Sequence, residues 1–351
     1  MLLEGMFLPL TTPFTPDGRL NTSKLKDNVT RYSKTPAAGL VALSRTGQPT
    51  LLSDTETRDA LRAVAEAAAA EKVLVAGVAR DSVAGTLELI GYSAGLGYDA
   101  VLVPVPSMLR GASSTREVLS FYRTVADGAV LPVVIDAGLA EVAVETLAEL
   151  AGHPGVFGVV DGSHDASRMR EIVQATAAVR HEVSVTAVFA AVTGRMLKKH
   201  EPVEATFLPA GALSGGGAAL SVAPAKSGLK TRTKTVGFQI LCGRTAGMLE
   251  ALEAGAVGAM PPLAASAPQV CYEVMAAWKD GDPALAAEKQ DTLRSLAGMV
   301  EEEMGVSGLV AGIKYGCDLN GYFGGRPRLP LLPLTGRERE EIEGLMQGIR
   351  N

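Results

Sequence analysis

The chain has 351 residues, of which 47% are hydrophobic and 20% are charged, so it can bury a large core and is not wholly disordered. Its formal net charge of −5 argues against nucleic acid or an anionic membrane surface as the main partner. No apolar run is long enough to cross a bilayer, and three scattered cysteines without metal-ligand spacing indicate free thiols in the cytoplasm.

Short apolar runs alternate with helical patterns along most of the chain. The runs are rich in Val, Leu and Ile and mostly do not alternate with polar residues, as expected of parallel strands covered on both faces. Their repeated alternation with helices favours an α/β fold of the (β/α)8 TIM-barrel type. A doubly wound sheet would usually show a glycine-rich turn after its first strand, and PLTTPFTPDG is not one. We expect strands at 5–10, 39–43, 73–78, 100–104, 132–136, 156–161, 236–242 and 256–260.

Two parts of the chain fall outside this repeat. Residues 182–235 are rich in Gly, Ser, Ala and Lys, and we expect a flexible insertion within them. Because this segment connects a helix to a strand, it should lie at the N-terminal face of the barrel, away from the chemistry. From residue 267 onward the pattern is helical throughout. The sequence therefore predicts a barrel over 1–266 and a C-terminal helical appendage over 267–351.

Several phrases follow one another in an order and spacing that is specific when they are taken together. They include PLTTPFTPDGRLN, GLVALSRTGQPTLLSDTETR, LGYDAVLVPVP, LPVVIDAG and HPGVFGVVDGSHDASRM. Together they resemble the dihydrodipicolinate synthase / N-acetylneuraminate lyase family of pyruvate-handling class I aldolases. The resemblance implies a (β/α)8 barrel with a C-terminal helical domain, assembled as a homodimer or homotetramer. It also implies a small-molecule carboxylate as substrate or ligand, and we expect no cofactor and no metal.

The sequence departs from that family at the positions that carry its chemistry. The family's Schiff-base lysine, at the end of the sixth strand, falls on Val160, and its proton-relaying tyrosine falls on Asp136. The family's arginine for the second substrate falls on Glu141, and a second tyrosine falls on Met108. An imine requires a primary amine, which valine cannot supply. The sequence therefore predicts a divergent, lyase- or aldolase-like member without the Schiff-base mechanism.

Polar side chains nevertheless lie at and around these positions. The family's Thr-Thr-Gly-Glu phrase after the second strand falls on four residues that we expect to bind substrate: Arg45, Thr46, Gly47 and Gln48. Arg45 can bind a carboxylate or phosphate with two parallel hydrogen bonds. The candidate catalytic residues, from the ends of the fifth and sixth strands and the loop beyond, are Asp136, Asp161 and His164. Asp136 is the candidate general base.

Other arrangements remain open. Asp136, Asp161 and His164 could chelate a divalent ion that stabilises an enolate. Arg45 could instead pair with Asp136 or Asp161 and seal an inactive barrel mouth. A lysine elsewhere, such as Lys314, could replace the missing nucleophile, although none ends a strand. Two hypotheses result: an enzyme acting on a small 2-oxo acid or related carboxylate, and an inactive relative that binds a small molecule or a partner subunit.

Overall fold

The chain folds into a closed barrel of parallel strands in the computed structural model, which describes residues 1–111, 115–138, 140–163, 165–199 and 228–349. The strands are β1 (Gly5–Pro9), β2 (Gly39–Ala42), β3 (Val73–Gly77), β4 (Ala100–Pro104), β5 (Val133–Ala137), β6 (Val156–Asp161), β9 (Gln239–Cys242) and β10 (Gly258–Ala259). Their order around the barrel is β1-β10-β9-β6-β5-β4-β3-β2. The predicted (β/α)8 barrel is confirmed.

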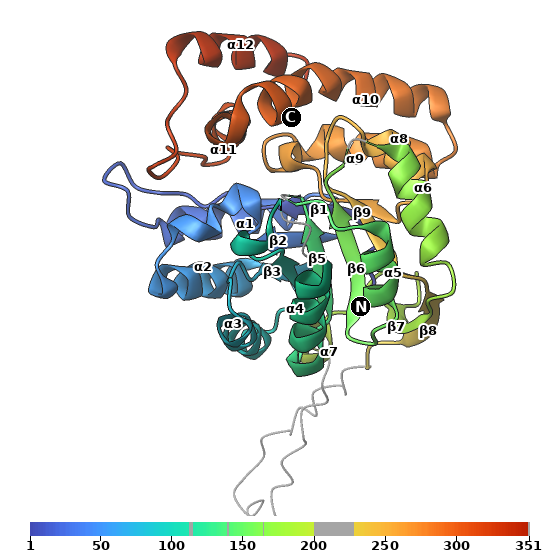
Figure 1. The fold of residues 1–351 in the computed structure, drawn as a ribbon. Coiled ribbons are helices and arrows are strands. Elements are labelled where there is room, and N and C mark those ends of the chain that lie inside the picture. The colour runs from blue at the N-terminus through green and yellow to red at the C-terminus, as the bar shows by residue number, and fades with distance from the viewer. Residues whose placement is uncertain (112–114, 139, 164, 200–227, 350–351) are drawn as a thin grey trace, which may run out of the picture.

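Helices between the strands cover the outside of the barrel (Figure 1). They are α1 (Thr22–Tyr32), α2 (Asp54–Ala67), α3 (Val83–Gly95), α4 (Thr115–Gly128), α5 (Val144–Ala151), α6 (Ala166–Ala175) and α8 (Met248–Glu253). The sequence fixes where α2 begins, because Ser53 and Glu56 each accept a hydrogen bond from the other's backbone N–H. Nowhere in the described part of the chain is a helix long and apolar enough to span a membrane.

Alternate residues of each strand face two different cores. Val134 and Val160 belong to a core inside the barrel, whereas Ile135 and Val159 pack in the layer between the strands and the helices. Neighbouring strands β5 and β6 are in register, with Asp136 opposite Val160. Because side chains alternate with a period of two, residues that are paired in this way point to the same face. Asp136 and Val160 therefore share the inside of the barrel.

Segments at both ends of the predicted insertion form regular structure. Strands β7 (His181–Thr186) and β8 (Thr231–Val236) pair antiparallel, and β7 packs with Leu2 at the N-terminal face of the barrel. Helix α7 (Gly194–Lys199) follows, and the N–H of Gly194 donates to Asp99, next to the start of β4. The range 182–235, within which we expect a flexible insertion, therefore begins and ends in strands. Residues 200–227 lie outside the described part of the chain.

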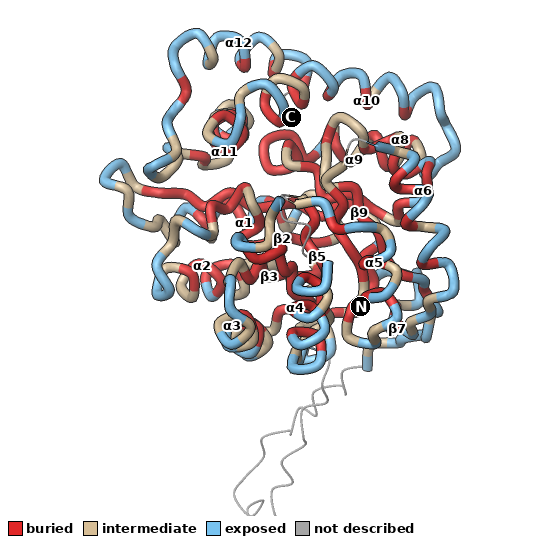
Figure 2. The backbone as a smooth tube through the Cα atoms, viewed as in Figure 1, coloured by how far each residue is buried: buried red, intermediate tan, exposed pale blue. Residues whose placement is uncertain are grey.

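Helices of the C-terminal region lie over the opposite, C-terminal end of the barrel (Figure 1). They are α9 (Pro268–Lys279), α10 (Pro283–Ala297), α11 (Gly305–Leu319) and α12 (Gly336–Met346), with a π-helical segment, Gly298–Glu303, between α10 and α11. Figure 2 shows buried residues where these helices face the barrel and exposed residues on their outer sides. Val310 of α11 is 2% exposed and lies over the barrel mouth.

The loop after α11 is held against the barrel by Arg328. Its guanidinium donates to both carboxylate oxygens of Glu56, at 2.7 and 2.6 Å, and to the carbonyl oxygen of Leu51 at 2.8 Å. This hydrogen bonding lowers the pKa of Glu56 to about 2. The contact joins the C-terminal region to the start of α2, beside the loop that follows β2.

Candidate active site

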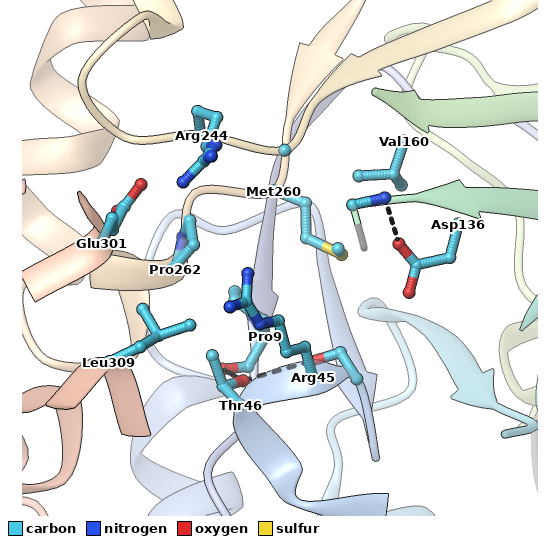
Figure 3. A pocket seen from close by; sticks show the side chains of 13 residues that line it. Pro9, Arg45, Thr46, Asp136, Val160, Arg244, Met260, Pro262, Glu301 and Leu309 are labelled. Atoms are coloured by element: carbon cyan, nitrogen blue, oxygen red, sulfur yellow. Dashed lines mark hydrogen bonds between the residues drawn. The ribbon is translucent and has the colours of Figure 1, made fainter. Parts of the chain in front are cut away.

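Two adjoining cavities lie between the ends of the barrel strands and the C-terminal helices. The inner cavity is about 40 Å³ and the outer cavity about 270 Å³, and both have Ser44, Arg45 and Asp136 in their walls. Active sites of (β/α)8 barrels lie at this end. The inner cavity (Figure 3) is also lined by Pro9, Thr46, Gly138, Val160, Gly243, Arg244, Met260, Pro262, Glu301 and Leu309.

Arg45 points its guanidinium group toward the middle of the inner cavity (Figure 3). Its Nε is buried and has no hydrogen-bond partner, and no carboxylate of the described residues lies within 4.0 Å as an ion-pair partner. Burial, and then the positive charge of Arg244, lowers the pKa of Arg45. The predicted pairing of Arg45 with Asp136 or Asp161 is therefore not observed. A half-buried guanidinium whose Nε has no partner is suited to hold an anion.

The residues after Arg45 have separate roles. Thr46 Oγ1 lies 3.1 Å from Ser44 Oγ and 3.2 Å from the carbonyl oxygen of Pro9, and the carbonyl oxygen of Gly47 accepts from Thr12. These contacts shape the loop. Gln48 is 3% exposed and lines the outer cavity, and neither polar atom of its side chain has a hydrogen-bond partner.

Asp136 provides a buried carboxyl group at the end of β5. It is 8% exposed, and its Oδ1 accepts a hydrogen bond of 2.9 Å from the N–H of Gly138. Burial raises the pKa of Asp136, while that hydrogen bond and the positive charges of Arg110 and Arg45 oppose the rise. Asp136 is the predicted catalytic residue that the structure places in the cavity.

Asp161 does not share this cavity, contrary to the prediction. It lies one position beyond Val160 on β6, so its side chain points outward, where it accepts from Arg168 Nε at 3.2 Å and from Ser163. Arg168 is buried too, so this ion pair joins β6 to α6. His164 lies outside the described residues. Among the residues that are described, no group of His, Cys, Asp and Glu is placed to hold a metal ion.

Two residues that the sequence analysis did not select complete the inner cavity. Arg244 follows β9 and donates from Nε to the carbonyl oxygen of Gly162 at 2.9 Å. Glu301, on the π-helical segment, is 7% exposed and accepts from the N–H of Thr245 at 3.1 Å, but its Oε1 has no partner. Figure 3 shows Glu301 beside Arg244. Burial raises the pKa of Glu301 to about 7, against the opposing effects of Thr245 and Arg244.

Glu301 should make stability fall as the pH rises toward neutrality. Its folded pKa of about 7 lies above the ordinary value of 4.5, so between these values the folded state keeps a proton that the unfolded state has released. The stabilisation is complete below pH 4.5 and is lost as the pH rises through 7, which amounts to about 3 kcal/mol. Urea unfolding at pH 5 and pH 8 should show most of this difference in the wild type, and Glu301→Gln should remove most of what is seen.

Glu303→Gln is the matched control, because Glu303 lies two residues away and is exposed. It should keep the pH dependence of the wild type. If both variants retain the wild-type profile, then Glu301 does not titrate in the cavity as described.

No lysine is among the described residues that line either cavity. Val160 occupies the inner wall at the end of β6, where the sequence analysis placed it. Lys314 is fully buried in α11, where its Nζ donates to the carbonyl oxygens of Thr12, at 2.7 Å, and Arg326, at 2.9 Å. Burial lowers the pKa of Lys314 to about 7. These contacts direct its ammonium group to main-chain carbonyls beside the barrel mouth.

A parallel barrel whose C-terminal mouth holds arginines and buried carboxyl groups is typical of barrel enzymes that act on small anions. Residues 2–185 and 225–349 match the model of the dihydrodipicolinate synthetase family, and the chain belongs to this family. A 4-hydroxy-tetrahydrodipicolinate synthase of Acidiphilium cryptum is 24% identical over 352 residues, which cover 99% of each chain. Another, of Xanthomonas axonopodis pv. citri, is 30% identical over 177 residues, which cover 49% of this chain and 58% of that one.

Solved structures show the same fold. A dihydrodipicolinate synthase from Bacillus anthracis superimposes with a TM-score of 0.77 at 18% identity and covers 100% of both chains. The prophage protein YagE of E. coli K12, solved in complex with pyruvate, gives a TM-score of 0.75 at 20% identity over 99% of each chain. These likenesses establish the barrel with its C-terminal helical region.

Proposed function

We propose that this member of the family is a lyase or aldolase-type enzyme that acts on a small 2-oxo acid or related carboxylate without forming a Schiff base. The observation that carries the proposal is the composition of the inner cavity. Val160 stands at the end of β6, and two guanidinium groups and two buried carboxyl groups line the same space. The names of the relatives, and the pyruvate bound to YagE, support a small carboxylate as the class of ligand.

Three of these polar groups have a chemical role in this proposal. The free donors of Arg45 bind the carboxylate of the substrate through two parallel hydrogen bonds. Asp136, the general base, takes a proton from the substrate next to its carbonyl group, and burial, which raises the pKa of Asp136, makes it a stronger base. The guanidinium of Arg244 stabilises the negative charge that then develops on the carbonyl oxygen. Because no covalent imine forms, these charged groups must provide all of the stabilisation of the negative charge on the carbonyl oxygen.

A second candidate is an inactive relative that binds a small molecule or serves as a partner subunit. The inactive relative is favoured because the positions of the family's catalytic side chains are occupied by other residues, namely Val160, Asp136, Glu141 and Met108. Both candidates are predicted to be cytoplasmic and to form a homodimer or homotetramer. Native mass spectrometry would check the oligomeric state.

Borohydride treatment in the presence of pyruvate should leave the mass of the protein unchanged, because no amine of the described cavity wall can form the imine that borohydride would reduce. Intact-mass spectrometry is the measurement, and a trapped pyruvate adduct would overturn the proposed mechanism. A panel of 2-oxo acids and sugar acids, with and without Mg²⁺, then separates the two candidates. Turnover supports the enzyme, whereas a rise in melting temperature without turnover supports the binding protein.

A further inference from the structure

The outer cavity has a different character from the inner one. At about 270 Å³ it has room for about nine water-sized groups. Its charged side chains are Arg45 and Asp136, shared with the inner cavity, and Arg110, which lies near enough to oppose the rise in the pKa of Asp136. The rest of the wall is formed largely by apolar residues, among them Leu43, Pro49, Leu51, Val306, Val310 and Leu331.

Gln48 is a polar residue in this mostly apolar wall. Its side-chain nitrogen and oxygen are both buried, and neither has a hydrogen-bond partner. Its backbone is in the left-handed region, with φ at 55°, which is uncommon for a residue other than glycine. Buried amide groups are nearly always hydrogen-bonded, so this pair of unpaired atoms marks a place where a ligand can supply the missing partner.

We propose that the outer cavity binds the hydrocarbon chain of the substrate, and that the Gln48 amide pairs with one uncharged oxygen on that chain. This inference rests on the proposed function, in which Arg45 holds the carboxylate where the two cavities meet. The substrate class is then an aliphatic 2-oxo acid that is longer than pyruvate and carries a hydroxyl or carbonyl oxygen. A second charged end could pair only at the polar end of the cavity, with Arg110, because the apolar residues that form most of the outer wall could not pair it.

Binding should strengthen with chain length. In a series from pyruvate through 2-oxobutanoate and 2-oxopentanoate to 2-oxohexanoate, each added methylene that enters the apolar wall should lower Kd by about three- to fourfold. Isothermal titration calorimetry on the full chain measures the series. A Kd that stays constant or rises along the series would overturn the proposal.

Leu331→Trp and Leu332→Trp form a matched pair of variants. Leu331 lines the outer cavity, whereas its neighbour Leu332 is 62% exposed. Tryptophan at the first position should fill the cavity and abolish the gain with chain length, while pyruvate binds as before. Tryptophan at the second position should leave the whole series unchanged. The same dependence on chain length in both variants would place the chain outside this cavity.

Gln48→Met tests the polar contact, because methionine has a similar volume without the amide. In the wild type, 2-oxopentanoates with one chain hydroxyl should bind at least as tightly as 2-oxopentanoate itself. In Gln48→Met the hydroxylated acids should bind about tenfold more weakly than the plain acid, since the hydroxyl is then buried without a partner. An unchanged ratio would remove Gln48 from this role.

The design separates failure of this inference from failure of the proposed function. If pyruvate binds and the longer acids gain nothing, only the outer cavity has been misassigned. If no 2-oxo acid binds, the anchoring role of Arg45 is wrong, and pentanamide then probes the outer cavity directly. Its carboxamide can pair with Gln48, so it should raise the melting temperature of the wild type and of Leu332→Trp but not of Leu331→Trp. Equal shifts in both variants, or none in the wild type, would overturn the proposal.

Discussion

Arg45→Gln should abolish the binding of small carboxylates, with Kd rising by about 100-fold or more, because it removes the positive charge that pairs with the anion. Arg45→Lys keeps the charge but loses the planar pair of donors, so Kd should rise by about tenfold. The fold should tolerate the change to glutamine. In the protein without ligand, Arg45 is a half-buried cation with an unpaired Nε beside another cation, Arg244, so its removal relieves an unfavourable arrangement.

The two effects are separated by measuring the melting temperature with and without ligand. We expect Arg45→Gln to melt at or above the wild-type temperature and to lose the ligand-induced shift. Arg80→Gln is the control, because Arg80 follows β3 at the same end of the barrel but pairs with Asp54 at 2.7 Å and lines neither cavity. It should keep the ligand-induced shift. Retention of the shift in Arg45→Gln would assign the anion to another group, with Arg244 the first to examine.

The barrel could be predicted from the sequence because strands that are buried on both faces leave continuous apolar runs. Strand β6 begins and ends where its run predicted, at Val156–Asp161. The orientation within that strand was harder to predict. Asp161 ends the strand, which predicts a place at the barrel mouth, but the end of a strand does not determine the face on which a side chain lies. The alternation of side chains, together with the register that pairs Asp136 with Val160, sends Asp161 outward to Arg168.

Glu301 could not be selected from its local sequence, since it belongs to a run of three glutamates near the end of a helical pattern, where such residues are usually exposed. A signal was present nevertheless. Glu301 lies four residues after Ala297 and eight after Leu293, which are both buried, so helical spacing places it on the apolar face. What the spacing cannot show is that this face covers a barrel mouth. That depends on how α10 and α11 dock, which is a long-range property.

The ends of the insertion illustrate the same limit in another way. In β7 the buried residues Val183 and Val185 alternate with the exposed residues Glu182 and Ser184, which is the pattern of a half-buried strand. The segment as a whole is rich in Gly and Ser, and this composition favours the prediction of an irregular segment although the short alternation indicates a strand. Its partner β8 is more than 40 residues further on, so no local turn signal joins the two strands.

Val160→Lys should create the covalent chemistry that the wild type lacks. Val160 is 2% exposed and lines the inner cavity next to Asp136, so an amine at this position would reach a 2-oxo acid held by Arg45. With pyruvate and borohydride, we expect the variant to gain the mass of one reduced pyruvate adduct while the wild type stays unmodified. Burial lowers the pKa of such an amine and Asp136 raises it, so the yield of the adduct should increase with pH.

Val160→Met is the control for this substitution, because its side chain is long and apolar and carries no amine. Both variants disturb the packing inside the barrel, so both should melt below the wild type, but only the lysine variant should be trapped. A folded Val160→Lys that gives no adduct would mean that position 160 does not face the bound ketone. An adduct in the wild type would mean that another lysine has taken over, and loss of that adduct in Lys314→Met would identify the buried amine of α11 as the nucleophile.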